Sequence, residues 1–199
     1  MKSLLHLAIA CAALAALPAI AQDAKARNFA DIYAVLEKAD AVVEGAKAPK
    51  RVLYVFWDAN CYYCNLTWKA LQYYEKAGLQ VRWVPVAYQK DNSAALAAAV
   101  MGAKDRVAAL RENETRYRPK SYDGGIKAAA KVPADLAIGL EENMTLMGRF
   151  GMSGTPALVW KDSKGAVRTH LGLPPLSKLP EITGLPEQKI DDPELAKFR

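Results

Sequence analysis

The sequence predicts an α/β domain with a mixed central sheet. A helical insertion lies between the second and third strands in chain order. A continuous apolar, β-branched and aromatic run at 51–57 has the length and composition of a buried central strand. A helical pattern follows it directly and leads to a second strand at 81–87, which is the strand–helix–strand order of a parallel pair. Helical residues at about 90–150 then precede two short strands near the C-terminus.

The first expected element is a helix at 29–44, where apolar residues recur on one side at helical spacing. The strand at 51–57 leads to a helix at about 61–77 and to the strand at 81–87, in which Pro85 suggests a sheet edge or a bulge. The remaining expected elements are helices at 93–112 and 134–150, a turn-rich break at 117–125, a loop at 151–156, strands at 157–160 and 167–171 joined by a hairpin turn, and a short helix after Pro174. The hairpin adds antiparallel strands, so the expected sheet is mixed.

The first 21 residues have the pattern of a secretory signal peptide. Lys2 supplies a positive start, the run from Leu4 to Ile20 is almost wholly apolar, and Ala19-Ile20-Ala21 forms a small-x-small cleavage site. This run is shorter than a membrane-spanning helix requires. We therefore expect export to the periplasm. The chain divides into a signal peptide at 1–21, an N-terminal helix and linker at 22–50, a folded domain at 51–185 with a helical insertion at about 90–150, and a C-terminal tail at 186–199.

Charge and composition argue against two classes of function, nucleic-acid binding and metal binding. The chain carries 27 Lys and Arg against 21 Asp and Glu, a formal net charge of +6. The basic residues form no dense run, so we expect no nucleic acid partner. Cleavage would remove Cys11 and one of the two histidines, which leaves Cys61, Cys64 and His170. Zinc needs four ligands, or three and a water, so we expect no metal, and we expect no cofactor.

Cys61 and Cys64 are the residues that carry chemistry. A structural disulfide in an exported protein gains most when it closes a long loop, and this pair encloses only two residues. Cys61 stands where the first strand gives way to a helix, and a helix N-terminus can lower a thiol pKa from about 8.5 to about 3.5–7.5. We therefore predict Cys61 as the nucleophile and Cys64, three residues on, as the resolving thiol.

Two further features are predicted to bind a substrate chain. The loop Gly154-Thr155-Pro156-Ala157 precedes a short apolar strand, and we expect a cis Thr155-Pro156 bond beside Cys61, with the Thr155 backbone free to pair with a substrate strand. Tyr62 and Tyr63 stand between the cysteines, and tyrosine is enriched at interfaces. We expect Tyr62 to be exposed, whereas Tyr63 is predicted either to join this surface or to pack on its own domain.

Together these residues resemble the Dsb family of periplasmic thiol:disulfide interchange proteins, on its DsbC/DsbG side. The resemblance rests on Val55-Phe56-Trp57-Asp58 before Cys61-Tyr62-Tyr63-Cys64, on the Thr155-Pro156 loop and on Gly172-Leu173-Pro174, and it covers about residues 50–180. It implies a thioredoxin-like fold with a catalytic domain at 51–185. It also implies reduction or isomerisation of disulfides in exported proteins, and an inner-membrane thiol:disulfide donor that keeps the pair reduced.

This chain departs from that family in two ways. Tyr62 replaces the small residue or Pro that is usual after the first cysteine, so the family's reduction potential does not carry over. The residues before 51 can supply one helix rather than a dimerisation domain, so we expect a monomer. Two alternatives stay open: a DsbA-like dithiol oxidase, and a chaperone-like binding module for unfolded exported proteins. Loss of function in a Cys61→Ala protein would separate either enzyme from the module.

Overall fold

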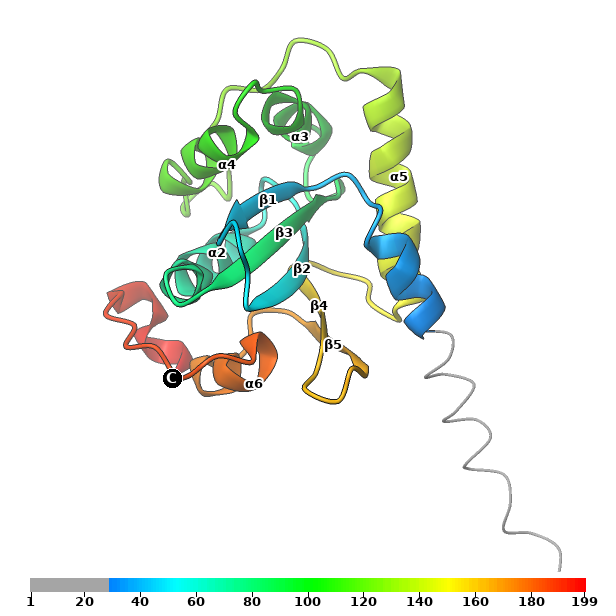
Figure 1. Cartoon of the computed structure of the whole chain (residues 1–199). Coiled ribbons are helices and arrows are strands. Elements are labelled where there is room, and N and C mark those ends of the chain that lie inside the picture. Colours follow the sequence, from blue (N-terminus) through cyan, green and yellow to red (C-terminus); the bar gives the residue numbers. More distant parts are fainter. Residues whose placement is uncertain (1–28) are drawn as a thin grey trace, which may run out of the picture.

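The computed structural model describes residues 29–199, so the expected signal peptide lies outside the described residues. A five-stranded sheet with the order β1-β3-β2-β4-β5 forms the centre of the molecule (Figure 1). Only β2 and β3 run parallel, and the other pairs are antiparallel, which gives the expected mixed sheet. The strands are β1 (Val42–Gly45), β2 (Arg51–Trp57), β3 (Leu79–Pro85), β4 (Ala157–Lys161) and β5 (Val167–Leu171).

Helices cover both faces of this sheet. Successive residues of a strand point to opposite faces. Leu53, Val55 and Trp57 of β2 accordingly pack with α2, α3, α4 and α6, whereas Tyr54 and Phe56 pack with α5 and a helix at 29–36. The helices are α2 (Tyr62–Glu75), α3 (Ser93–Met101), α4 (Arg106–Thr115), α5 (Ala134–Arg149) and α6 (Leu179–Thr183), with 3₁₀ turns η1 (Leu176–Lys178) and η2 (Pro193–Phe198).

The prediction of one helix over 29–44 was wrong. The helix ends at residue 36, and Val42–Gly45 form β1, which pairs antiparallel with β3 from Val42 opposite Trp83 to Gly45 opposite Gln80. Helical periodicity could not reveal this pairing because β1 is stabilised by hydrogen bonds to a strand far along the chain, which override local propensity. The buried Glu44 carboxylate adds to this, accepting hydrogen bonds from the Trp68 and Trp83 indoles at 3.1 Å each.

Two other expectations need correction. β3 is an interior strand, not an edge, and Pro85 is tolerated because it lies beyond the last residue paired with β1. The expected helix at 93–112 is two helices: α3 ends at a Gly102 cap, and Asp105 caps α4 by accepting a hydrogen bond from the Ala108 backbone N–H at 2.9 Å.

The tail packs on the domain, with Leu195 buried and Glu194 paired with Lys69 of α2.

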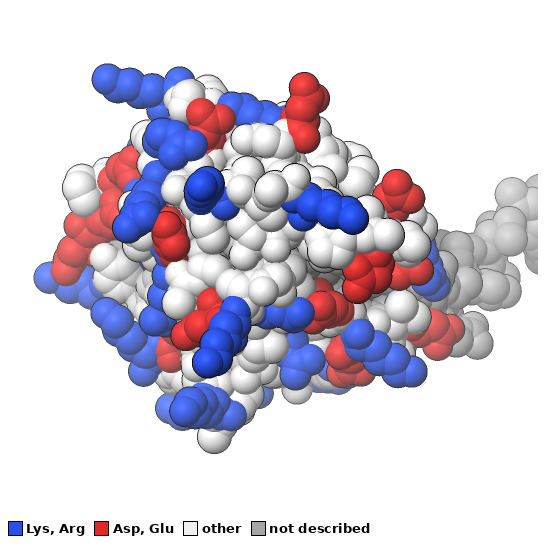
Figure 2. Space-filling view, turned by 90° about the horizontal axis from the view of Figure 1, so that it is seen from above, with Lys and Arg blue, Asp and Glu red and all other residues white. Residues whose placement is uncertain are grey.

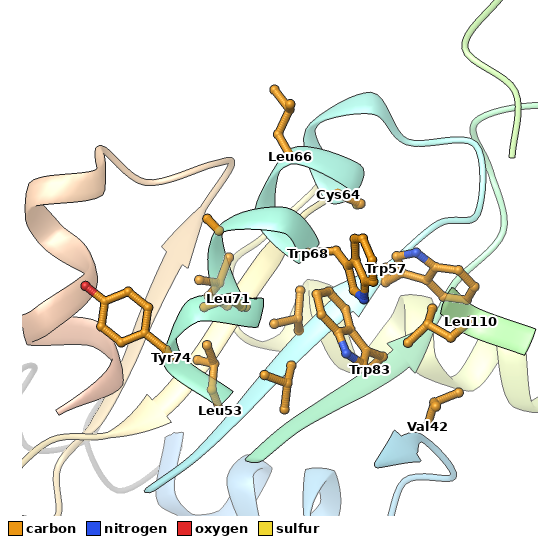
Figure 3. Packing of buried hydrophobic residues seen from close by; sticks show 14 of the residues in the cluster. Val42, Leu53, Trp57, Cys64, Leu66, Trp68, Leu71, Tyr74, Trp83 and Leu110 are labelled. Carbon is orange, nitrogen blue, oxygen red and sulfur yellow. The ribbon is translucent and has the colours of Figure 1, made fainter. Parts of the chain in front are cut away.

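The core beneath α2 is rich in indole rings. Figure 3 shows Cys64 of α2 in the same packed cluster as Trp57, Trp68 and Trp83. Leu110 of α4 closes this cluster from the side of the helical insertion. One end of the cysteine pair is therefore sealed in a water-excluded core, while the other end faces the loops at the helix start.

The outer surface shows mixed charge. Viewed from above α3, α4 and α5, Lys and Arg are interspersed with Asp and Glu around a central area without charged side chains (Figure 2). Within residues 29–199, none of the helices combines the length and the apolar character needed to cross a membrane.

Candidate active site

Cys61 is the N-cap residue of α2, which confirms its expected position at the helix start. Its Sγ accepts a hydrogen bond from the Cys64 backbone N–H at 3.2 Å, and only 4% of the residue is exposed. The pKa of the Cys61 thiol is lowered chiefly by its hydrogen bond with the Cys64 side chain, and further by the Thr155 side chain and the Cys64 N–H. Burial and the nearby Asp58 charge oppose this shift but do not cancel it.

Cys64 is fully buried, one helical turn into α2. Burial raises the pKa of its thiol well above the ordinary value, and the neighbouring Cys61 raises it further. Both cysteines are free thiols here. As the pH rises, the Cys61 thiol therefore loses its proton first, and the Cys64 thiol stays protonated to a higher pH.

The Thr155–Pro156 peptide bond is cis, as expected, and lies beside the cysteine pair. The Cys61 thiol donates a hydrogen bond to the Thr155 carbonyl oxygen at 3.3 Å. The Thr155 hydroxyl shares a hydrogen bond of 2.9 Å with the Tyr88 hydroxyl, from the loop after β3. The loop is thus placed where a chain bound to Cys61 would meet it, although its role in binding a substrate stays a prediction.

Asp58 organises the loops around the pair. Its buried carboxylate accepts four hydrogen bonds: from the Asn60 backbone N–H and the Ser93 hydroxyl at 2.9 Å, and from the backbone N–H groups of Tyr88 at 2.8 Å and Gln89 at 3.0 Å. Asp58 does not cap α2, because Cys61 itself is the N-cap residue. Asp58 instead ties the end of β2 to the segment that carries Tyr88.

Glu114 is a second buried carboxyl near the pair, and it comes from α4 of the helical insertion. It accepts hydrogen bonds from Trp57 Nε1 at 2.8 Å and from the side-chain amides of Asn65 and Asn113 at 2.9 Å. No cation pairs with it among these contacts, and burial raises its pKa to about 7. Its charge in turn raises the pKa of the Cys64 thiol. Burial therefore moves the titration of Glu114 toward neutral pH, and its charge acts on Cys64.

Four tyrosines surround the start of α2. Tyr63 is 51% exposed, whereas Tyr62 is only partly exposed, so the expectation that Tyr62 is the exposed member of the pair was wrong. The Tyr62 ring packs against those of Tyr63 at 5.5 Å, Tyr117 at 6.3 Å and Tyr122 at 5.9 Å between ring centroids. Tyr117 is anchored through its hydroxyl, which donates to the Asn60 carbonyl oxygen at 2.8 Å.

A shallow pocket of about 180 Å³ opens beside Cys61, and we call it the tyrosine pocket. It is lined by Asn60, Cys61, Tyr62, Tyr63, Gln89, Lys90, Tyr122 and Thr155. Four of the six predicted site residues meet there. The other two, Cys64 and Pro156, are buried and are not part of its lining.

Sequence reasoning missed Glu114, Tyr117 and Tyr122 because all three belong to the helical insertion. Nothing in their local pattern marks them: Glu114 falls just past the expected end of a helix, and the two tyrosines lie in a stretch expected only as a turn-rich break.

The part of the chain that the structure describes contains no cluster of metal-binding side chains. No three His, Cys, Asp or Glu side chains there are grouped so that they could hold an ion. His170 lies on β5, and burial lowers its pKa.

Comparison with known proteins supports the same fold. A family model described as a thioredoxin-like domain matches residues 36–181. The chain is 30% identical over 155 residues to the thiol:disulfide interchange protein DsbG of Pseudomonas aeruginosa, covering 77% of this chain and 59% of that protein. It is 33% identical over 124 residues to DsbC of Haemophilus influenzae, covering 61% of this chain and 49% of that protein. The chain thus spans only about half to three fifths of the length of these relatives.

Solved structures show the same architecture. The catalytic domain of Proteus mirabilis ScsC superposes with a TM-score of 0.61 at 23% identity, over 78% of this chain and 94% of that one. Pseudomonas aeruginosa DsbA2 gives 0.59 at 15% identity, over 72% and 92%. At these identities the likeness establishes the fold, and it confirms the expected thioredoxin-like arrangement with a helical insertion.

Proposed function

This chain belongs to the thioredoxin-like domain family, and we propose that it is a periplasmic thiol:disulfide oxidoreductase that reduces or isomerises disulfides in exported proteins. The observation that carries the proposal is the asymmetry of the pair. Cys61 has a lowered pKa at the helix start, and Cys64 is fully buried with a raised one. A thiolate is the attacking species in disulfide exchange, so the two cysteines suit successive steps.

In the first step the Cys61 thiolate attacks one sulfur of a substrate disulfide. A bond forms between Cys61 and that sulfur, the substrate S–S bond breaks, and the second substrate sulfur leaves as a thiolate that takes a proton from solvent. The cis loop supports this step, because a substrate strand can pair with the Thr155 backbone while its sulfur lies in line with Cys61. The Cys61 thiol must release the Thr155 carbonyl oxygen, to which it donates in the free protein.

In the second step Cys64 resolves the mixed disulfide. Its thiol loses a proton, attacks the Cys61 sulfur and closes the Cys61–Cys64 disulfide, and the substrate sulfur leaves as a thiolate that takes a proton from solvent. We propose that Glu114 accepts this proton, because its pKa of about 7 leaves it partly ionised at neutral pH. Isomerisation needs no second step by Cys64: another substrate thiolate attacks the mixed disulfide and restores the Cys61 thiolate.

The proposal includes partners that complete the cycle. Each reduction leaves the pair oxidised, so an inner-membrane dithiol donor is proposed to supply two electrons and two protons. The substrates are proposed to be exported proteins with cysteines or disulfides, and the protein is proposed to act as a monomer. Sedimentation equilibrium at micromolar concentration tests the last point, and a stable dimer mass would contradict it.

Reduction of insulin by the purified protein, with a small dithiol as electron source, tests the activity. Cys61→Ala should abolish turnover. Cys64→Ala should still react once and accumulate a mixed disulfide with the substrate, which mass spectrometry detects. Turnover by the Cys61→Ala protein would refute the proposal and would favour a binding module in which the thiols are incidental.

A second candidate, the dithiol oxidase, is favoured by one observation. Hydrogen bonds that lower the Cys61 pKa stabilise the reduced form, and a stabilised reduced form makes a dithiol pair a stronger oxidant. Equilibration of the Cys61–Cys64 pair with glutathione buffers separates the two candidates. A potential well above that of glutathione would favour the oxidase, and a potential near or below it would favour the reductase.

A further inference from the structure

We infer that the tyrosine pocket selects, in the bound polypeptide, an aromatic side chain next to the cysteine that Cys61 attacks. The inference rests on the proposed function and names the substrate feature that the site would recognise. The residues that would contact this side chain are Tyr63 and Tyr122, the exposed rings that line the pocket beside Cys61.

The pocket has the size of a single side chain. At about 180 Å³ it is smaller than the roughly 300–1,000 Å³ of sites that enclose a drug-sized ligand. Cys61 and Thr155 line it together with the tyrosines. A strand paired with the Thr155 backbone and joined to Cys61 through its own cysteine would therefore place a neighbouring side chain in this pocket.

Tyr122 is held in an unusual conformation at this position. Its φ is 53°, in the left-handed region that bulky residues rarely adopt, yet 56% of the residue stays exposed. Residues in such conformations persist where the surroundings fix them, and they cluster at binding sites. The ring is thus presented to solvent at the pocket rather than packed in a core.

The surroundings of Tyr122 are fixed from two sides. A β-bridge joins Arg118 to Asp123 across the turn. Lys90, from the loop after β3, donates to the Ser121 carbonyl oxygen at 2.5 Å and pairs with the Asp123 carboxylate at 2.6 Å. The turn cannot swing away without breaking these contacts, so the wall is already formed before a substrate binds.

Charge decides which side chain fits. Tyrosine rings attract both aromatic groups and cations. The charged residue in the lining is Lys90, and no Asp or Glu lines the pocket. A bound lysine or arginine would find no carboxylate in this lining, because the nearby Asp123 is already paired with Lys90, whereas a phenyl ring can stack against Tyr63 and Tyr122. The occupant is therefore an aromatic side chain.

The test uses short extended peptides with one cysteine coupled to thionitrobenzoate. The Cys61 thiolate attacks the peptide sulfur and releases coloured thionitrobenzoate, so the release rate measures the first step. Three peptides carry Phe, Ala or Arg next to the cysteine, on either side in turn. Tyr122→Asn removes the ring with a residue that tolerates positive φ, Tyr122→Phe keeps the ring, and Ile138→Asn is the control at an exposed apolar residue on α5.

We expect the Phe peptide to react about two- to tenfold faster than the Ala peptide, the factor that corresponds to one aromatic contact. Tyr122→Asn should remove this preference, measured as the ratio of the Phe and Ala rates within one protein, while Tyr122→Phe and Ile138→Asn should keep it. Ile138→Asn should also react with a small aliphatic disulfide at the wild-type rate. Equal rates for Phe and Ala, a preference for Arg, or a preference that survives in Tyr122→Asn would overturn the inference while leaving the oxidoreductase intact. Failure to react with any peptide or with the small disulfide would refute the proposed function itself, and the inference with it.

Discussion

Replacing Glu114 by Gln removes a buried carboxyl whose pKa is raised by burial from 4.5 to about 7. The folded chain holds this proton more tightly than the unfolded chain does. The contribution of the group to stability is therefore full below about pH 4.5 and is lost as the pH rises through about 7. At about 1.4 kcal/mol per pKa unit the total loss is about 3 kcal/mol, of which roughly 2.5 kcal/mol falls between pH 5 and pH 8.

Urea unfolding of reduced wild type and Glu114→Gln, followed by tryptophan fluorescence across this pH range, measures that loss. The amide adds a constant cost, because its N–H₂ group faces the donors that the carboxylate accepted from, but this cost cancels when the stability difference is compared between pH values. Glu112→Gln, which removes a surface ion pair with Arg116 on the same helix, is the matched control and should change the free energy of unfolding by no more than about 1 kcal/mol. A Glu114→Gln difference that does not change with pH would refute both the raised pKa and the proposed proton transfer to Glu114.

Three further outcomes are expected. Alkylation of the reduced protein at mildly acidic pH should label Cys61 before Cys64, as mass mapping would show, because their pKa values are shifted in opposite directions. Asp58→Ala should lower the free energy of unfolding by roughly 2–6 kcal/mol, because it leaves buried donors unpaired. It should also lower the Cys61 pKa further, because a nearby negative charge is removed. Denaturant unfolding measures the first effect, and a pH titration of the alkylation rate measures the second. Gly124→Ala should destabilise the insertion by about 1–3 kcal/mol, since a Cβ there would lie 2.3 Å from Asn113 Oδ1; an unchanged melting temperature would contradict it.

The sequence predicted the sheet well where local pattern and tertiary context agree. The run Arg51–Trp57 is apolar on both faces because helices cover both, so its composition alone marks a central strand. Val42–Gly45 carries no such mark. The charged Glu44 is buried and Val43 is exposed, so polarity does not follow burial along this strand, and only pairing with β3 reveals it.

The candidate site divides in the same way. Cys61 and Cys64 could be placed because strand, helix and cysteines are contiguous, so helix geometry fixes their relation. Thr155 required the global fold, which the resemblance supplied. Glu114 and Tyr122 could not be placed, because their approach to α2 depends on how the insertion folds back on the sheet.

Because the insertion folds back on the sheet, it forms part of the site. Asn60, the residue before Cys61, makes four hydrogen bonds to the insertion. Its carbonyl oxygen accepts from the Tyr117 hydroxyl at 2.8 Å, and its Oδ1 accepts from the Gly124 N–H at 3.0 Å. Its Nδ2 donates to Asn92 Oδ1 at 2.8 Å and to Ser93 Oγ at 2.9 Å. The insertion also supplies Glu114 behind Cys64 and Tyr122 in front of Cys61. The same segment thus meets the start of α2 on the core side, through Glu114 and Asn65, and at the pocket, through Tyr122. Because Asn60 adjoins Cys61, a change in the insertion should alter the chemistry of the Cys61 thiol and, under the proposed function, the choice of substrate.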